Sequence, residues 1–85
     1  MSALQGKVAL VTGSAGTMGL AVVRALLDDG CTVAMVDFSA ERNEALAKTL
    51  GASAHAFSFD ISDAEAVRNG HAAVVAAVGA VDILI

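Results

Sequence analysis

The most constraining feature of this sequence is a short apolar run that ends in three regularly spaced glycines. Residues 8–11 are all apolar, Gly13, Gly16 and Gly19 follow, and an apolar helical pattern begins at once. A strand, a glycine turn and a helix in this order place free backbone N–H groups and the positive helix end before a phosphate. We expect Gly13 to allow a tight turn, Gly16 to let a pyrophosphate approach, and Gly19 to bring helix and strand together. This stretch therefore predicts a dinucleotide site.

The rest of the chain alternates short apolar runs with helical patterns. We expect strands over residues 8–11, 32–36, 54–59 and 81–85, and helices over residues 17–29, 40–50 and 63–78. Continuous apolar strands are typical of parallel sheets that are covered on both faces. Strands separated by helices imply right-handed crossovers, so the pattern predicts an α/β fold of the form β-α-β-α-β-α-β with a parallel sheet.

Local signals predict which helical residues are buried and where the third helix begins. Met18, Val22 and Leu26 are spaced by four, which predicts that they form the buried stripe of the first helix. Ser62 and Glu65 fit a capping box, in which Ser62 caps the third helix and Glu65 reaches back to it.

Composition narrows the function classes. The 85 residues allow one domain, and 56% of them are hydrophobic. A net charge of −4 with five scattered basic residues argues against nucleic-acid binding. There is no apolar run of the roughly 20 residues that a membrane span needs, and no signal-peptide pattern, so we expect a cytoplasmic protein.

The residues that most often ligate metals or react as nucleophiles have ordinary interpretations here. The lone Cys31 follows Gly30 at the start of a strand, so we expect a buried, small apolar residue rather than a reactive thiol. His55 and His71 have no second ligand at metal spacing, so no metal site is predicted.

Four segments resemble the short-chain dehydrogenase/reductase family. They are GKVALVTG at residues 6–13, Asp37 at the end of the second strand, DISD at residues 60–63 and VDILI at residues 81–85. The resemblance covers essentially the whole chain. It implies a Rossmann-type half-fold with the strand order 3-2-1-4, a nicotinamide cofactor and, in complete members, hydride transfer to or from an alcohol or carbonyl.

The sequence departs from the family pattern in two places. The usual loop, TGxxxGxG, would have glycine at Thr17, whereas this chain has Gly16 and fits the TGxxGxxG form of the extended branch. Complete members continue into an Asn-Asn-Ala-Gly segment, a catalytic serine and a Tyr-x-x-x-Lys pair, while these 85 residues contain no tyrosine. We therefore expect residues 1–85 to be a single, truncated dinucleotide-binding domain with no catalytic residues and no dehydrogenase activity by itself.

Asp37 decides which cofactor is expected. At the end of the second strand, its carboxylate can accept hydrogen bonds from both adenosine ribose hydroxyls and would repel a 2′-phosphate. The resemblance implies that a basic partner for that phosphate would be at Ser14 or Phe38, and neither is basic. The sequence therefore predicts NAD over NADP, although Asp37 could also be a solvated acid in a turn.

The resemblance adds an adenine contact, with Asp60 toward the exocyclic amine and Ile61 either against the ring or in contact through its backbone. Without the family, Asp60 could equally be a turn residue beside a helix. For Thr12 we expect a hydroxyl that fixes the loop or the neighbouring strand. The predicted cofactor-binding residues are Gly13, Ser14, Gly16, Thr17, Met18, Gly19, Asp37, Phe38, Asp60 and Ile61.

Two other functions fit the sequence. The chain could be a non-catalytic interaction module that associates through the edge of the fourth strand, where only Asp82 interrupts an apolar run. We expect a homodimer or larger homo-oligomer through this edge. A binder of another adenine nucleotide or of S-adenosylmethionine fits less well, because the Thr-Gly opening and the DISD segment argue against it.

Overall fold

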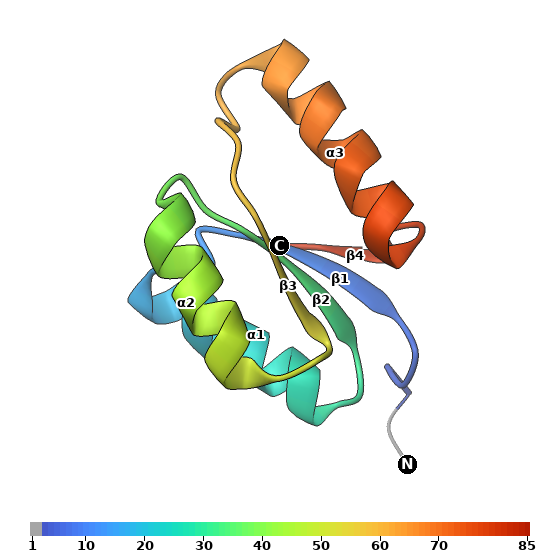
Figure 1. The fold of residues 1–85 in the computed structure, drawn as a ribbon. Helices are drawn as coiled ribbons and strands as arrows, with labels where there is room; N and C mark the ends of the chain where they lie inside the picture. The colour runs from blue at the N-terminus through green and yellow to red at the C-terminus, as the bar shows by residue number, and fades with distance from the viewer. Residues whose placement is uncertain (1–2) are drawn as a thin grey trace.

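The computed structural model describes residues 3–85 as one four-stranded parallel sheet with helices on both faces (Figure 1). The strands are β1 (Val8–Thr12), β2 (Thr32–Val36), β3 (Ala54–Phe57) and β4 (Ile83–Leu84). Their order in the sheet is β3-β2-β1-β4, and every neighbouring pair is parallel. The predicted Rossmann-type half-fold and its strand order 3-2-1-4 are confirmed.

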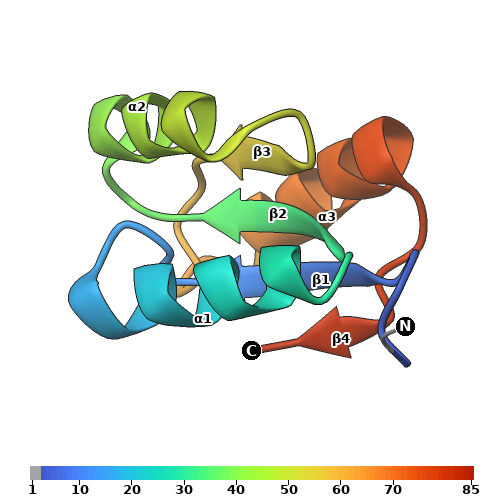
Figure 2. The same ribbon diagram turned by 90° about the horizontal axis from the view of Figure 1, so that it is seen from below.

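The helices are α1 (Thr17–Asp28), α2 (Ala40–Leu50) and α3 (Ala64–Val78). Helices α1 and α2 cover one face of the sheet, and α3 covers the other (Figures 1 and 2). None of the helices in residues 3–85 has the length and apolar character needed to cross a membrane.

The sheet separates two apolar clusters. The larger one lies under α1 and α2, and its buried members are Ala9, Val11, Val23, Leu26, Cys31, Val33, Met35, Ala47 and Ala54. The smaller one lies under α3 and contains Leu10, Ala34, Val36 and Val74. Alternate residues of β1 and β2 enter opposite clusters because successive strand side chains point to opposite faces.

Two predicted strands are shorter than expected. β3 ends at Phe57, whose carbonyl accepts the Asp37 N–H (3.3 Å), and the chain then leaves the ladder. β4 is confined to Ile83–Leu84. Phe59 packs instead against Gly70 of α3, where an added Cβ would collide with the aromatic ring. An apolar run predicted the strand, but Phe59 is apolar because it packs between sheet and helix.

The predicted stripe on α1 is wrong in part. Met18 is 84% exposed, whereas Val23 and Leu26 are the buried residues of this helix. Met18 is the second residue of α1, beside the glycine turn, and the helix meets the sheet only farther along. Periodicity alone does not reveal which end of a helix extends beyond the sheet.

The predicted cap of α3 is also wrong. The N-cap is Asp63, whose carboxylate accepts the Glu65 N–H (3.1 Å). Ser62 donates its hydroxyl to Asp60 Oδ1 (2.6 Å) and is therefore engaged elsewhere. Both residue types are good caps, and the preceding turn decides between them.

Cys31 is buried in the larger cluster, as predicted. Burial raises the pKa of its thiol, and the nearby carboxylates of Asp29 and Asp82 raise it further. The neutral thiol is therefore favoured, as expected for a residue that fills space.

Candidate functional site

The turn between β1 and α1 has the geometry that its glycines predict. Gly13 has a φ of 65°, a left-handed conformation that favours glycine. The Ser14 N–H donates to the Val36 carbonyl (3.2 Å), which ties the turn to the end of β2. On the other side of β1, the Thr12 hydroxyl donates to the Ile85 carbonyl (2.9 Å). Thr12 thus fixes the neighbouring strand, as predicted.

Gly19 brings α1 against the turn. A Cβ on Gly19 would overlap the Gly13 carbonyl, whereas a Cβ on Gly16 would lie 3.3 Å from the same oxygen. Gly16 is the N-cap of α1 and supplies no capping side chain, and the first turn of the helix carries no acidic residue. The first N–H groups of α1 therefore have no side-chain cap and can receive an anion.

Asp37 lies directly after β2 and faces this turn. Its Oδ2 accepts the Ala15 N–H (2.9 Å), and its Oδ1 accepts the Ser39 N–H (2.9 Å). Two backbone donors therefore fix the orientation of the carboxylate. Each oxygen keeps further acceptor capacity for a ligand hydroxyl.

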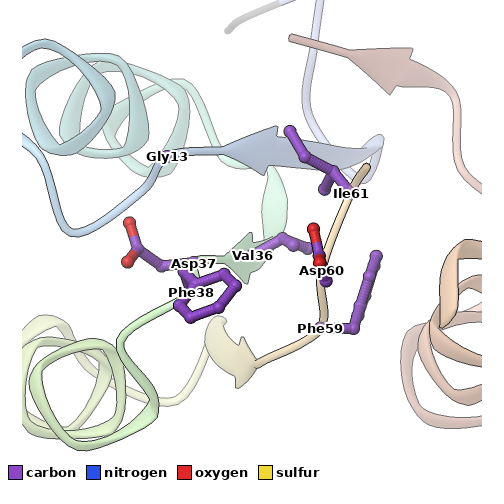
Figure 3. A pocket seen from close by; sticks show the side chains of 7 residues that line it. All are labelled: Gly13, Val36, Asp37, Phe38, Phe59, Asp60 and Ile61. Atoms are coloured by element: carbon purple, nitrogen blue, oxygen red, sulfur yellow. The ribbon is translucent and has the colours of Figure 1, made fainter. Parts of the chain in front are cut away.

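A hollow with a volume of about 190 Å³ opens beside Asp37 (Figure 3). Val36, Asp37 and Phe38 line it from the end of β2, whereas Phe59, Asp60 and Ile61 line it from the segment after β3; Gly13 completes the wall. Phe38 is 79% exposed and Ile61 is 59% exposed. Exposed apolar side chains around a small hollow suit the faces of a flat aromatic ligand.

Asp60 is held by the turn that precedes α3. Its Oδ1 accepts the Ser62 hydroxyl (2.6 Å) and the Ser62 N–H (2.9 Å). These two hydrogen bonds lower the pKa of the Asp60 carboxyl, and the one from the Ser62 hydroxyl has the larger effect. The group is therefore an anionic acceptor at neutral pH.

Asn43, which is fully buried on α2, is not among the predicted site residues. Its Nδ2 donates to the carbonyls of Met35 (2.8 Å) and Phe57 (3.0 Å), and its Oδ1 accepts the Ser14 hydroxyl (2.7 Å). The available signal was its spacing of four from Ala47, the other buried residue of this helix. A polar residue on the buried stripe of an amphipathic helix needs hydrogen-bond partners.

The ten predicted site residues gather at the carboxyl end of the sheet in two groups. Gly13, Asp37, Phe38, Asp60 and Ile61 line the hollow. The others, Ser14, Gly16, Thr17, Met18 and Gly19, belong to the turn and the start of α1. Within the second group Ser14 is buried, and both its hydroxyl and its N–H are used inside the protein.

Comparisons with known proteins agree with this geometry. A sequence profile of the short chain dehydrogenase family matches residues 7–85. D-threitol dehydrogenase of Mycolicibacterium smegmatis is 45% identical over 96% of this chain and 33% of its own length. The 2,3-dihydro-2,3-dihydroxybenzoate dehydrogenase of Bacillus subtilis is 35% identical, with the same coverage.

Solved structures give the same result. The 3-ketoacyl-(acyl-carrier-protein) reductase from Brucella melitensis, solved in complex with NADH, superimposes with a TM-score of 0.91 at 34% identity. The match covers 96% of this chain and 34% of that protein. The chain thus spans about a third of the length of the relatives it matches. With this sequence profile, these relatives and this fold, the chain belongs to the short-chain dehydrogenase family.

Proposed function

We propose that this chain binds NAD through its adenosine and pyrophosphate groups. The observation that carries the proposal is the hydrogen bond between the Ala15 N–H and Asp37 Oδ2, because it brings the glycine turn and the carboxylate together beside the hollow. A dinucleotide needs these features together: donors for phosphate, an acceptor for ribose and apolar walls for adenine.

Each part of the site has a role in this proposal. The backbone of Gly16, Thr17 and Met18 at the start of α1 receives the pyrophosphate. Asp37 accepts hydrogen bonds from the ribose hydroxyls, and Phe38 and Ile61 flank the adenine ring. Asp60, anionic at neutral pH, accepts a hydrogen bond from the exocyclic amino group of adenine.

NAD is preferred over NADP because the 2′-phosphate would lie against the Asp37 carboxylate. Neither Ser14 nor Phe38 offers a positive charge, and the Ser14 side chain is turned inward to Asn43. Two like charges in contact repel each other, and the repulsion is stronger where water is excluded.

Titration calorimetry of the 85-residue chain with NAD, ADP-ribose and NADP tests the proposal. We expect NADP to bind at least about tenfold more weakly than NAD, a difference of about 1.4 kcal/mol. Asp37→Ala should remove most of that preference. Asp28→Ala, an exposed acid at the far end of α1, is the matched control and should leave the ranking unchanged. Equal affinity of the wild type for NAD and NADP would refute the role of Asp37.

For the complete protein we propose hydride transfer between NAD and an alcohol or carbonyl, in the cytoplasm. The 85 residues contain no tyrosine to act as the family's acid/base, so this chain alone should be inactive. The expected absorbance change at 340 nm is zero with NAD and any alcohol. Measurable turnover by the purified 85-residue chain would overturn this expectation.

A second candidate function is self-association through β4. Within residues 3–85 this strand pairs only with β1, and Leu84 beside the open edge is 73% exposed. Unprotected apolar edges pair with other strands, and a two-fold contact of β4 with β4 would cover both copies. Light scattering at micromolar concentration should show a dimer or larger assembly that Leu84→Lys dissociates. A monomeric wild type would exclude this candidate.

A further inference from the structure

Asn43 contacts the glycine turn and the two strands, β2 and β3, that lead into the other segments of the proposed nucleotide site. Its side chain reaches Ser14 in the glycine turn, Met35 in β2 and Phe57 at the end of β3. Both N–H bonds of its amide and its carbonyl oxygen are engaged, in a position with no solvent exposure. A buried amide is costly unless every polar atom is paired, so an apolar residue would serve packing at least as well.

The hydrogen bonds of Asn43 close a ring around the site. Asn43 accepts from Ser14, and the next residue, Ala15, donates its N–H to Asp37. The Asp37 N–H donates to the Phe57 carbonyl, which also accepts from Asn43. The ring therefore runs from the glycine turn, where the phosphate is proposed to bind, through the Asp37 carboxylate, which is proposed to bind the ribose, to β3, the strand that leads to Asp60.

The ring acts mainly on the turn. β2 and β3 keep their register through the parallel ladder, which pairs Val36 with Phe57 whatever the residue at position 43. The turn has no such ladder, and its attachment to β2 consists of the Ser14 N–H bond to Val36 and the Ala15 bond to Asp37. Asn43 adds the attachment of the Ser14 side chain.

We propose that Asn43 is a positioning residue that holds the glycine turn at the correct distance from Asp37, so that one ligand can reach both. This inference rests on the proposed binding of NAD. A ligand that spans the turn and the hollow needs their spacing to be fixed, whereas a ligand that occupies the hollow alone does not.

The test compares ADP-ribose, which carries the pyrophosphate, with adenosine, which lacks it. Affinities are measured by NMR titration of the isotopically labelled 85-residue chain. Asn43→Ala and Ser14→Ala should each lower the affinity for ADP-ribose by about tenfold and leave the affinity for adenosine within about twofold. Because both changes open the same ring, the double variant should lose little more than either single one.

Thr49→Ala is the matched control on the same helix. Its hydroxyl donates to the Leu46 carbonyl, away from the ring, so the ratio of the two affinities should stay at the wild-type value. A parallel loss of ADP-ribose and adenosine binding in Ser14→Ala would overturn the proposal, because general destabilisation lowers both together. If Asn43→Ala does not fold, Ser14→Ala alone decides, since it removes the side-chain attachment of the turn to Asn43 and leaves Asn43 bonded to both strands.

Amide hydrogen exchange separates this inference from the function on which it rests. In Ser14→Ala the Ala15 N–H should exchange at least about tenfold faster, while amides within α2 keep their rates. If the wild type binds neither ligand, the proposed function fails, and this measurement still reports whether the ring holds the turn. An unchanged Ala15 rate would overturn the positioning role.

Discussion

The two faces of the sheet are covered very differently. On the face under α1 and α2, apolar residues from both helices and three strands form a continuous buried cluster. On the opposite face, α3 contributes one fully buried apolar side chain, Val74, while Val67 and Val75 are 37% and 40% exposed. A second hollow, with a volume of about 270 Å³, lies there between α3 and the ends of β1 and β4.

The difference shows where the proposed site obtains its rigidity. The glycine turn and Asp37 belong to the elements of the well-covered face, and Asn43 reaches them from α2. The part of the site proposed for adenine depends on residues 59–61, which connect the sheet to α3 on the less covered face. We therefore expect substitutions on the first face to disturb folding and binding more than substitutions on the second.

The largest effect is expected at Gly19. Gly19→Ala forces a methyl group into the Gly13 carbonyl, so α1 must move away from β1. We expect a loss of about 3 kcal/mol in the free energy of unfolding, measured by urea denaturation. Gly16→Ala is the matched control, because its methyl would lie 3.3 Å from the same oxygen and should cost less than about 1 kcal/mol. Equal losses would mean that the contact between α1 and the turn is not tight.

Val74 tests how much stability the thin cover of α3 provides. Val74→Ala removes the one fully buried apolar side chain of this helix and should cost about 2 kcal/mol. Val75→Ala, at a neighbouring position that is 40% exposed, should cost less than about 0.5 kcal/mol. If the two variants unfold at the same urea concentration, α3 does not pack as described.

Gly70 tests the contact between α3 and Phe59. Gly70→Ala improves helix propensity by about 1 kcal/mol but pushes a methyl group into the aromatic ring, so we expect a net loss of about 1 kcal/mol. In a Phe59→Ala background the collision is absent, and the same substitution should stabilise the chain by about 1 kcal/mol. A destabilising Gly70→Ala in that background would contradict this explanation.

The smallest effect concerns Asp60. Its pKa is lower in the folded chain than in the unfolded chain, so its contribution to stability is present above the unfolded pKa and is lost as the pH falls through the folded one. Ser62→Ala removes the hydroxyl donor and should raise the Asp60 pKa toward the ordinary value of about 3.9, as followed by an NMR pH titration. An unchanged pKa would show that the Ser62 N–H alone is sufficient.

Much of the fold could be predicted because its signals are local. The turn chemistry of Gly13 and the apolar runs identified every strand and helix, and the family resemblance supplied the strand order. The errors arose where a contact outside the motif decides, in one case a tertiary contact and in the other a local turn. Phe59 is apolar because it packs on Gly70, and Ser62 does not cap α3 because Asp60 binds its hydroxyl.

The candidate site likewise has a part that could be predicted from local sequence and a part that could not. Its turn and acidic residues follow from strand ends that meet at one edge of a parallel sheet. Asn43 could not be linked to Ser14, because nothing in the linear sequence pairs two residues that meet only after α2 packs on the sheet. Polar residues on buried helical stripes are the feature to examine in other sequences of this kind.

The central position of β1 also has a consequence for the order in which the chain assembles. Ala9 pairs with Val33 of β2 on one side and with Ile83 of β4 on the other. The chain segment between Ala9 and Ile83 is about three times as long as the segment between Ala9 and Val33. Closing the longer segment into a loop therefore costs about 1 kcal/mol more in chain entropy. The Val8 N–H likewise cannot form its hydrogen bond until its acceptor, the Asp82 carboxylate 74 residues farther along the chain, is present. During synthesis on the ribosome, this edge of β1 therefore stays unpaired until residues 82–84 have emerged, and an unpaired apolar strand edge can pair with a wrong strand in the meantime.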